Sequence, residues 1–225
     1  MEDDKQETPL TDAEWLWRQG ECPEAETWLY EQERADVIAV VRLALAAGKL
    51  EWADWSVMIA MTPAERIYYA VYATNMAIRE AKSRGYHDAA PLKTMKTVEA
   101  YLSIPLSALT EADRAAVIKA SQQSTTSVAN AHKMERRAAK AARETTYGSC
   151  AHRSACNAWR ASLAIADAAD AAASTAWAVA YPEEARDRTR DAVTNAIRPL
   201  KPDERHSVIA YGIALLENRY RPENM

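Results

Sequence analysis

The stretch from Arg114 to Tyr181 constrains the fold of this chain most, because it is rich in alanine and holds one glycine and no proline. Alanine is the best helix former, since it loses no side-chain entropy when a helix forms. Many alanines together also allow two helices to approach each other closely. The sequence Tyr147-Gly148-Ser149 supplies a turn inside the stretch. The stretch therefore predicts two long helices folded back on each other.

The composition of the chain supports a helical protein with its own core. Its 225 residues are enough for one large domain or two small ones. Five glycines are few for this length, which disfavours a β architecture rich in turns. Three cysteines make an odd and sparse set, which suits a reducing compartment better than a disulfide scaffold. We therefore expect a cytoplasmic protein.

No segment has the pattern of a targeting signal or a membrane span. The first ten residues, MEDDKQETPL, are acidic and polar, so they predict a disordered arm rather than a signal peptide. The longest apolar run, residues 161–180, contains Asp167 and Asp170. Alanine side chains are too weakly hydrophobic to offset two carboxylates in lipid. The sequence predicts no membrane contact.

Capping signals and apolar spacing divide the chain into helices. Capping boxes predict helix starts at Thr11, Thr62 and Thr110, and a proline follows Thr62 at the first helical position. Apolar residues at helical spacing, ended by glycine or proline, complete the pattern. The predicted helices are 11–20, 23–32, 35–47, 51–61, 62–84, 91–102, 110 to the turn at 147–149, 150–181, 183–198 and 202–220. The polar run 122–127 is a place where the long helix can bend.

These elements predict an all-α fold, a helical bundle with a C-terminal pair of long alanine-rich antiparallel helices. We expect residues 11–225 to form a single helical domain. The sequence Ser103-Ile104-Pro105 breaks a helix, so a boundary between two subregions is expected near residues 103–109.

Basic side chains gather on one of the two long helices. Residues 119–166 carry eight Lys and Arg against two Glu, a formal charge of +6, which leaves −10 for the rest of the chain. Five of the basic residues lie opposite the apolar stripe of their helix: Lys133, Arg136, Arg137, Lys140 and Arg143. One interpretation is a solvated face, paired with acids such as Glu183, Glu184 and Asp187. The other is a docking surface for an acidic protein or a nucleic acid. No aromatic residue is interleaved with the basic ones, which disfavours base stacking.

Asp170 is the second candidate contact residue. It falls on a stripe where apolar residues are expected, with Trp159, Leu163, Ala166, Ala173 and Trp177. A buried carboxylate needs a partner. Asp170 is therefore either paired with an arginine of the neighbouring helix or in contact with a bound protein.

The sequence contains no convincing catalytic or metal-binding motif. Cys150, His152 and Cys156, with His132 on the preceding helix, are the residues closest to a metal set, which leaves a helical metalloenzyme as a third hypothesis. They lack CxxC or HExxH spacing, and cysteines packed beside alanines are the commoner outcome. No catalytic triad order, phosphate-binding loop or dinucleotide fingerprint is present. We expect a non-enzymatic protein with no metal and no cofactor.

A series of segments spans roughly residues 20–180: Cys22–Leu29, Leu43–Trp55, a tyrosine-bearing helix, a proline break, Val98–Leu102 and the alanine blocks. In this order the segments resemble the all-helical immunity-protein family found beside bacterial polymorphic toxins and also in phage genomes. Asp54 and Trp55 match the most recognisable part of the family pattern, whereas the tail after Pro199 departs from it. The resemblance supplies no contact residues.

The resemblance implies a protein that binds a protein effector and neutralises it. The effector would be a toxin, or a bacterial defence complex if the chain acts for a phage. The alternative is a helical protein that binds nucleic acid with the basic face of residues 132–143. Formation of a homodimer is left open. The segment around Trp52 and Trp55 is a further candidate surface, because aromatic anchors concentrate binding energy.

Overall fold

The structure is a computed structural model that describes residues 27–28, 36–85 and 88–219. Within these residues it contains eight α-helices, two short 3-10 helices and no strand, so the predicted all-α class is confirmed. The predicted disordered arm 1–10 and the predicted helix 11–20 lie outside the described residues. Of the predicted helix 23–32, only Thr27 and Trp28 are described, and both are helical.

The chain divides into two compact units. One unit comprises the described residues up to Met61 together with those from His206 onward, and the other comprises the described residues between Thr62 and Arg205. The expected subregion boundary at 103–109 therefore lies inside the second unit. This segment holds the 3-10 helix η1 (Leu106–Ala108), which connects two helices that pack against each other.

The first unit contains α3 (Val37–Ala46), α4 (Leu50–Ala60) and most of α10 (Pro202–Arg219). Asp36 caps α3 by accepting a hydrogen bond from the Ile38 amide. Gly48 adopts a φ of 71° between α3 and α4, a left-handed conformation that glycine adopts without steric cost. The unit buries apolar side chains of all three helices: Val40, Val41, Val57, Ile209 and Leu216.

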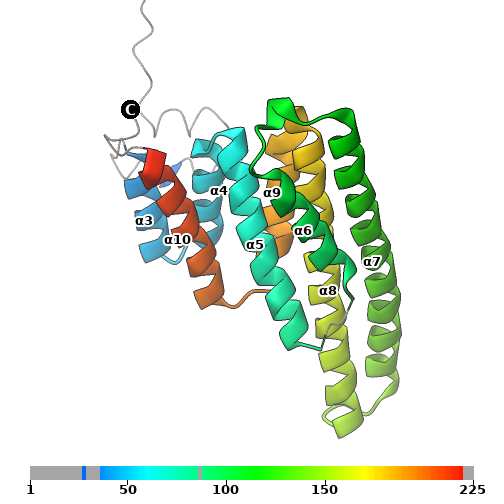
Figure 1. Cartoon of the computed structure of the whole chain (residues 1–225). Coiled ribbons are helices and arrows are strands. Elements are labelled where there is room, and N and C mark those ends of the chain that lie inside the picture. The colour runs from blue at the N-terminus through cyan, green and yellow to red at the C-terminus, as the bar shows by residue number, and fades with distance from the viewer. Residues whose placement is uncertain (1–26, 29–35, 86–87, 220–225) are drawn as a thin grey trace, which may run out of the picture. The chain divides into compact units, whose positions relative to one another are not determined.

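The second unit is built around α8 (Cys150–Ala180). Figure 1 shows α5 (Pro63–Ser83), α6 (Ala90–Tyr101), α7 (Glu111–Glu144) and α9 (Ala185–Ile197) alongside it, and each of the four packs against α8. Most buried residues of α8 are alanines, from Ala164 to Ala180. Small side chains at these positions let several helices approach one central helix, as the alanine content predicts.

The helix starts predicted at Thr62 and Thr110 are confirmed. Each threonine hydroxyl accepts a hydrogen bond from the amide three residues later, and the carboxylates of Glu65 and Asp113 accept one from the threonine amide. The predicted helix 62–84 is observed as α5, which is followed by Gly85 with a φ of 89°.

The polar run 122–127 does not interrupt α7, which continues from Glu111 to Glu144. Ser121 donates a hydrogen bond of 2.9 Å to the carbonyl of Ala173 on α8, and Ser124 donates one of 2.8 Å to Thr94 on α6. Ser127 donates to Asp88, ahead of α6, at 2.5 Å. The serines thus lie on the packed face of α7 and bond to neighbouring elements.

A candidate docking arm formed by α7 and α8

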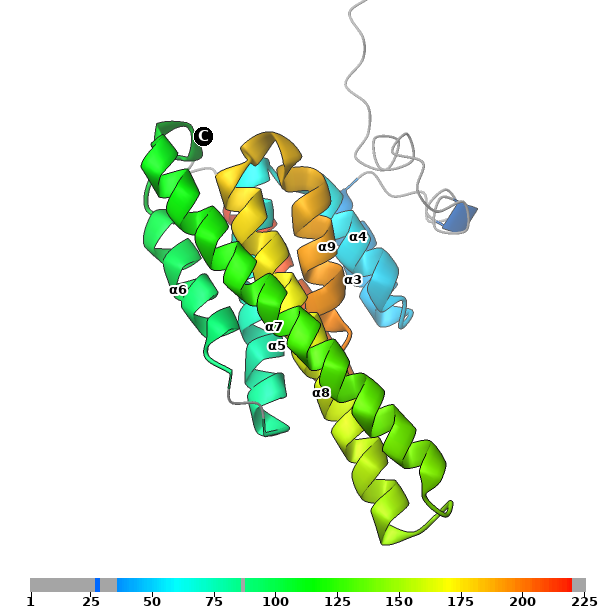
Figure 2. The ribbon, with the colours of Figure 1, turned by 90° about the vertical axis from the view of Figure 1, so that its right-hand side faces the viewer.

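The lower halves of α7 and α8 form an arm that extends beyond the other helices of the second unit. Figures 1 and 2 both show the two helices running antiparallel past the ends of α5, α6 and α9 to a short connection at residues 145–149. We define the docking arm as residues 132–161. None of these residues, all of which the structure describes, is buried. The predicted pair of long antiparallel helices is therefore observed, and its far end has no core.

Small side chains hold the two helices of the arm together. Ala138 and Ala142 of α7 and Ala155 of α8 are only half-buried. The turn between the helices places Gly148 at a φ of 80°, and Ser149 caps α8 by accepting from the His152 amide at 3.0 Å. The alanines give a close contact with little apolar area, so the arm contributes little hydrophobic stabilisation.

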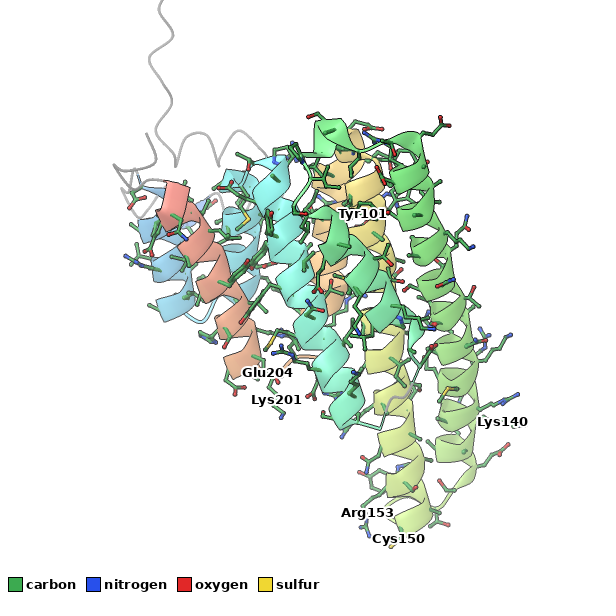
Figure 3. All side chains as sticks on the ribbon, viewed as in Figure 1. Tyr101, Lys140, Cys150, Arg153, Lys201 and Glu204 are labelled. Atoms are coloured by element: carbon green, nitrogen blue, oxygen red, sulfur yellow. The ribbon has the colours of Figure 1, made fainter. Side chains whose placement is uncertain are left out.

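The five predicted basic residues lie on the outer face of α7 within this arm. Lys133, Arg136, Arg137, Lys140 and Arg143 are all exposed. Lys140 is 3.7 Å from Glu144, and Figure 3 shows its side chain pointing away from the bundle. Among the described residues, the other four form no ion pair. Their charges are therefore available to a partner.

Glu184, one of the acids suggested as intramolecular partners of this face, has other contacts. Glu184 accepts hydrogen bonds from Trp177 at 3.0 Å and from Arg188 at 3.1 Å. These bonds lower the pKa of Glu184 below its ordinary value, with the Trp177 bond as the larger cause. The basic face is solvated, but Glu184 does not neutralise it.

The second helix of the arm adds two exposed arginines, Arg153 and Arg160. Neither was among the contact residues predicted from the sequence. Arg160 lies in the third turn of α8, and Arg153 donates to the Gly148 carbonyl at 3.1 Å near the tip. Figure 3 shows Arg153 and Cys150 at the lower end of the arm. With these two, the arm carries seven Lys and Arg against two Glu, a net formal charge of +5.

Exposed apolar side chains accompany this charge. The structure describes four large apolar side chains that are exposed, and three of them lie on the arm: Met134 (52%), Tyr147 (90%) and Trp159 (38%). The sequence predicted that Trp159 lies on an apolar stripe of α8. That stripe is buried only higher up, where other helices cover α8. The arm extends past those helices, and the tryptophan is exposed there.

Trp159 is held by contacts across the arm. Its indole N–H lies 3.5 Å from the carboxylate of Glu135 on α7, and the Nδ1 atom of His132 lies 2.9 Å from the same carboxylate. The bond to His132 is the largest cause of a lowered pKa at Glu135, and the bond to Trp159 acts in the same direction. The contact fixes the side of the arm on which the tryptophan lies.

Asp170 lies above the arm and is half-buried. The predicted arginine partner is not its contact: Asn195 of α9 donates a hydrogen bond of 2.6 Å to its carboxylate. Arg198, the C-cap residue of α9, instead lies 3.7 Å from Asp167, one turn before Asp170. Burial is the main reason that the pKa of Asp170 is raised, and the nearby charge of Asp191 raises it further. Burial likewise raises the pKa of Asp167.

Of the cysteines and histidines of the arm, His152 and Cys156 contact each other, whereas His132 bonds to Glu135. His152 bonds through Nδ1 to the Ala142 carbonyl at 3.0 Å, and its Nε2 atom is 3.6 Å from the Cys156 sulfur. Cys150 is exposed and contacts Arg153. Within the described residues, no group of three His, Cys, Asp or Glu side chains is arranged to hold a metal ion.

The tryptophan-bearing segment of the first unit makes internal contacts. The ammonium group of Lys49 lies 3.6 Å from the ring centroid of Trp52, and Trp28 is 5.6 Å from the same ring. Asp54 is buried. The indole N–H of Trp55 is buried and has no hydrogen-bond partner in the described part of the chain.

Comparison of the chain with family models, with curated proteins and with solved structures yields no match. Among the described helices, none is long and apolar enough to cross a membrane.

Proposed function

We propose that this chain is a non-enzymatic interaction protein that binds a protein effector and neutralises it, with the docking arm as its contact surface. One observation carries the proposal. Residues 132–161 contain no buried side chain, yet they hold seven cations and three exposed apolar side chains. A helix pair without a core contributes little to folding. The combination of arginines with aromatic and apolar side chains is typical of residues that dominate binding energy.

The charge distribution points to an acidic partner. The arm carries +5 in a chain whose formal charge is −4, so the remaining residues carry −9. An isolated positive surface on an acidic protein steers negatively charged partners toward that surface and repels them elsewhere. The effector class, a toxin or a bacterial defence complex, rests on the resemblance to immunity proteins.

Capture of partners with two forms of the protein tests this function. The wild-type chain and a variant with Arg136, Arg137 and Lys140 changed to Glu serve as baits in nuclease-treated lysate of the host. We expect the wild-type bait to retain a protein that the variant loses, and raised salt to release the same protein. Identical retention by both baits would contradict docking through the basic face.

Nucleic acid binding is the second candidate, because Trp159 lies on the same arm as Arg153 and Arg160. Stacking of bases on an aromatic ring beside arginines is a common mode of single-strand recognition. A titration with duplex and single-stranded oligonucleotides at rising salt separates the two candidates. Phosphate contacts would make affinity fall steeply and linearly with the logarithm of salt concentration.

A further inference from the structure

The two helices of the arm share a face on the side where α9 packs. Helical spacing places His132, Glu135 and Ala139 of α7 and Cys156 and Trp159 of α8 on this side, and His132 interacts electrostatically with Asp167 there. The contacts of Glu135 with His132 and Trp159 join the two helices along this side. Arginines border it: Arg136 and Arg143 on α7, Arg153 and Arg160 on α8, all exposed. We call this surface the Trp159 face.

The Trp159 face continues a surface that α9 covers higher up. There Asn195 bonds to Asp170, and Arg198 pairs with Asp167. The helix α9 ends at Ile197, and Figure 2 shows that α7 and α8 run on well past this end. From Leu163 down to His152 the same side of α8 has no buried residue except Ser162. One helix thus covers the upper part of the surface and leaves the lower part open.

We propose that the Trp159 face binds an amphipathic helix of a protein partner, with an apolar stripe on Trp159 and acidic side chains against the four arginines. The inference rests on the proposed function and specifies its partner. Charge complementarity selects the acidic flanks, because four cations border the face and none of them has an ion pair among the described residues. Tryptophan and arginine are the residue types that most often concentrate binding energy.

The dimensions and floor of the face fit a helix. Residues 152–163 span about 18 Å along α8, which matches about three helical turns. Ala139 and Cys156 are half-buried and small, so a second backbone can approach closely. The bound helix would extend the packing that α9 makes on the upper part of α8, and it would be recognised in the helix-in-groove manner of amphipathic peptides.

The carboxylates near the face favour a helix over a nucleic acid strand. Glu135 lies on the face itself, and Asp167 lies at its upper end. A regular row of phosphates along the arginines would meet both carboxylates and be repelled. A helix can place neutral or basic residues at those positions and acids opposite the arginines.

A designed peptide tests the proposal. The probe is a fluorescent peptide of about three heptads, with leucine at positions a and d and glutamate at e and g. The control peptide has the same composition, shuffled so that the leucines share no face. We expect the full-length protein to bind the probe at least about tenfold more tightly than the shuffled peptide, as measured by fluorescence anisotropy.

Variants locate the binding surface. Trp159→Ala, and separately the pair Arg153→Glu with Arg160→Glu, should each weaken probe binding at least about tenfold. The matched control changes Lys133 and Arg137 to Glu, which is the same charge change on the outer face of α7. This control should weaken probe binding by less than about threefold. Circular dichroism melting establishes that each variant folds.

Equal affinity for the shuffled peptide, or probe binding within about twofold of wild type for Trp159→Ala, would overturn the inference. Displacement of the probe by a single-stranded oligonucleotide that binds more tightly and depends on the same residues would also overturn it. The proposed function is tested separately, by loss of a captured protein from the Arg136, Arg137 and Lys140 variant. If the variant loses the captured protein but the probe peptide does not bind as expected, only the helix-binding inference is wrong. If the probe peptide binds as expected but the Arg136, Arg137 and Lys140 variant retains every protein that the wild type captures, the proposed function is wrong.

Discussion

The side-chain amide of Asn195 donates a 2.6 Å hydrogen bond to the carboxylate of Asp170, joining α9 to α8. A neutral donor stabilises an ionised carboxylate less than a cation does. Burial therefore raises the pKa of Asp170 above its ordinary value of 3.8, and the charge of Asp191 adds to this effect. Arg198 and His132 act in the opposite direction without cancelling it.

This arrangement predicts that Asp170→Asn stabilises the protein at neutral pH. A carboxyl whose pKa is raised on folding destabilises the folded protein above that pKa, where it is ionised, and this cost disappears below the unfolded value of 3.8. We expect a higher melting temperature for Asp170→Asn at about pH 7 and a difference that shrinks as the pH falls toward 3.8.

Asp187→Asn is the matched control, because Asp187 is exposed on α9. It should leave the melting temperature nearly unchanged at both pH values. A lower melting temperature for Asp170→Asn at neutral pH would mean that the ionised carboxylate is stabilising, and that the burial effect is smaller than the local hydrogen bonding.

The central position of α8 predicts that its alanines do not accept larger side chains. Ala169 is fully buried in the part of α8 that four helices surround. Ala169→Leu should lower the free energy of unfolding by about 1–3 kcal/mol through overpacking, and Ala169→Gly by about 1 kcal/mol through loss of helix propensity. Urea denaturation measures both. Ala151→Leu, on the exposed side of the arm, should change stability by less than about 0.5 kcal/mol. An unchanged midpoint for Ala169→Leu would disprove the close packing.

The buried hydroxyls between α6 and α7 predict that substitutions at Thr94 and Ser124 have non-additive effects on stability. Ser124 donates to Thr94, and Thr94 donates to the Ala120 carbonyl, both at 2.8 Å. Thr94→Val keeps the shape but removes the acceptor of Ser124, so it should cost about 1 kcal/mol or more. Ser124→Ala added to Thr94→Val should cost less than the sum of the single changes, because no donor is then left unpaired. Strict additivity in urea denaturation would show that Ser124 finds another acceptor.

The sequence was sufficient to predict the α-helices that the structure describes. Capping boxes at Thr62 and Thr110, together with glycine stops, mark helix ends by local hydrogen bonding, which depends little on the rest of the fold. Alanine content likewise predicted the close approach of α7 and α8. The serines of α7 were harder to interpret, because their partners Thr94 and Ala173 are far away in sequence.

The candidate site was only partly predictable. The charges of Lys133 to Arg143 were visible from helical spacing, since exposure on a helix follows from the position of its apolar stripe. The exposure of Trp159 was not visible, because it depends on where α9 ends relative to α8. The partner of Asp170 also depends on that register, which places Asn195 rather than Arg198 against it.

The outer face of α7 predicts that reversing its charge leaves the fold intact. Arg136, Arg137 and Lys140 are exposed, and Lys140 alone among them forms an ion pair within the described residues, with the exposed Glu144 one turn away. Changing all three to Glu should therefore alter the free energy of unfolding by at most about 0.5 kcal/mol each, as measured by thermal and urea denaturation.

The same triple reversal should slow association with an acidic effector much more than it speeds dissociation, and raised salt should reproduce this effect in the wild type. Reversal of Arg186 and Arg190 on α9 is a comparison that changes charge away from the arm. If the triple variant unfolds, the three cations are structural partners inside the protein. If it folds and its association rate is unchanged, the effector docks elsewhere, and the segment around Trp52 and Trp55 is the next surface to examine.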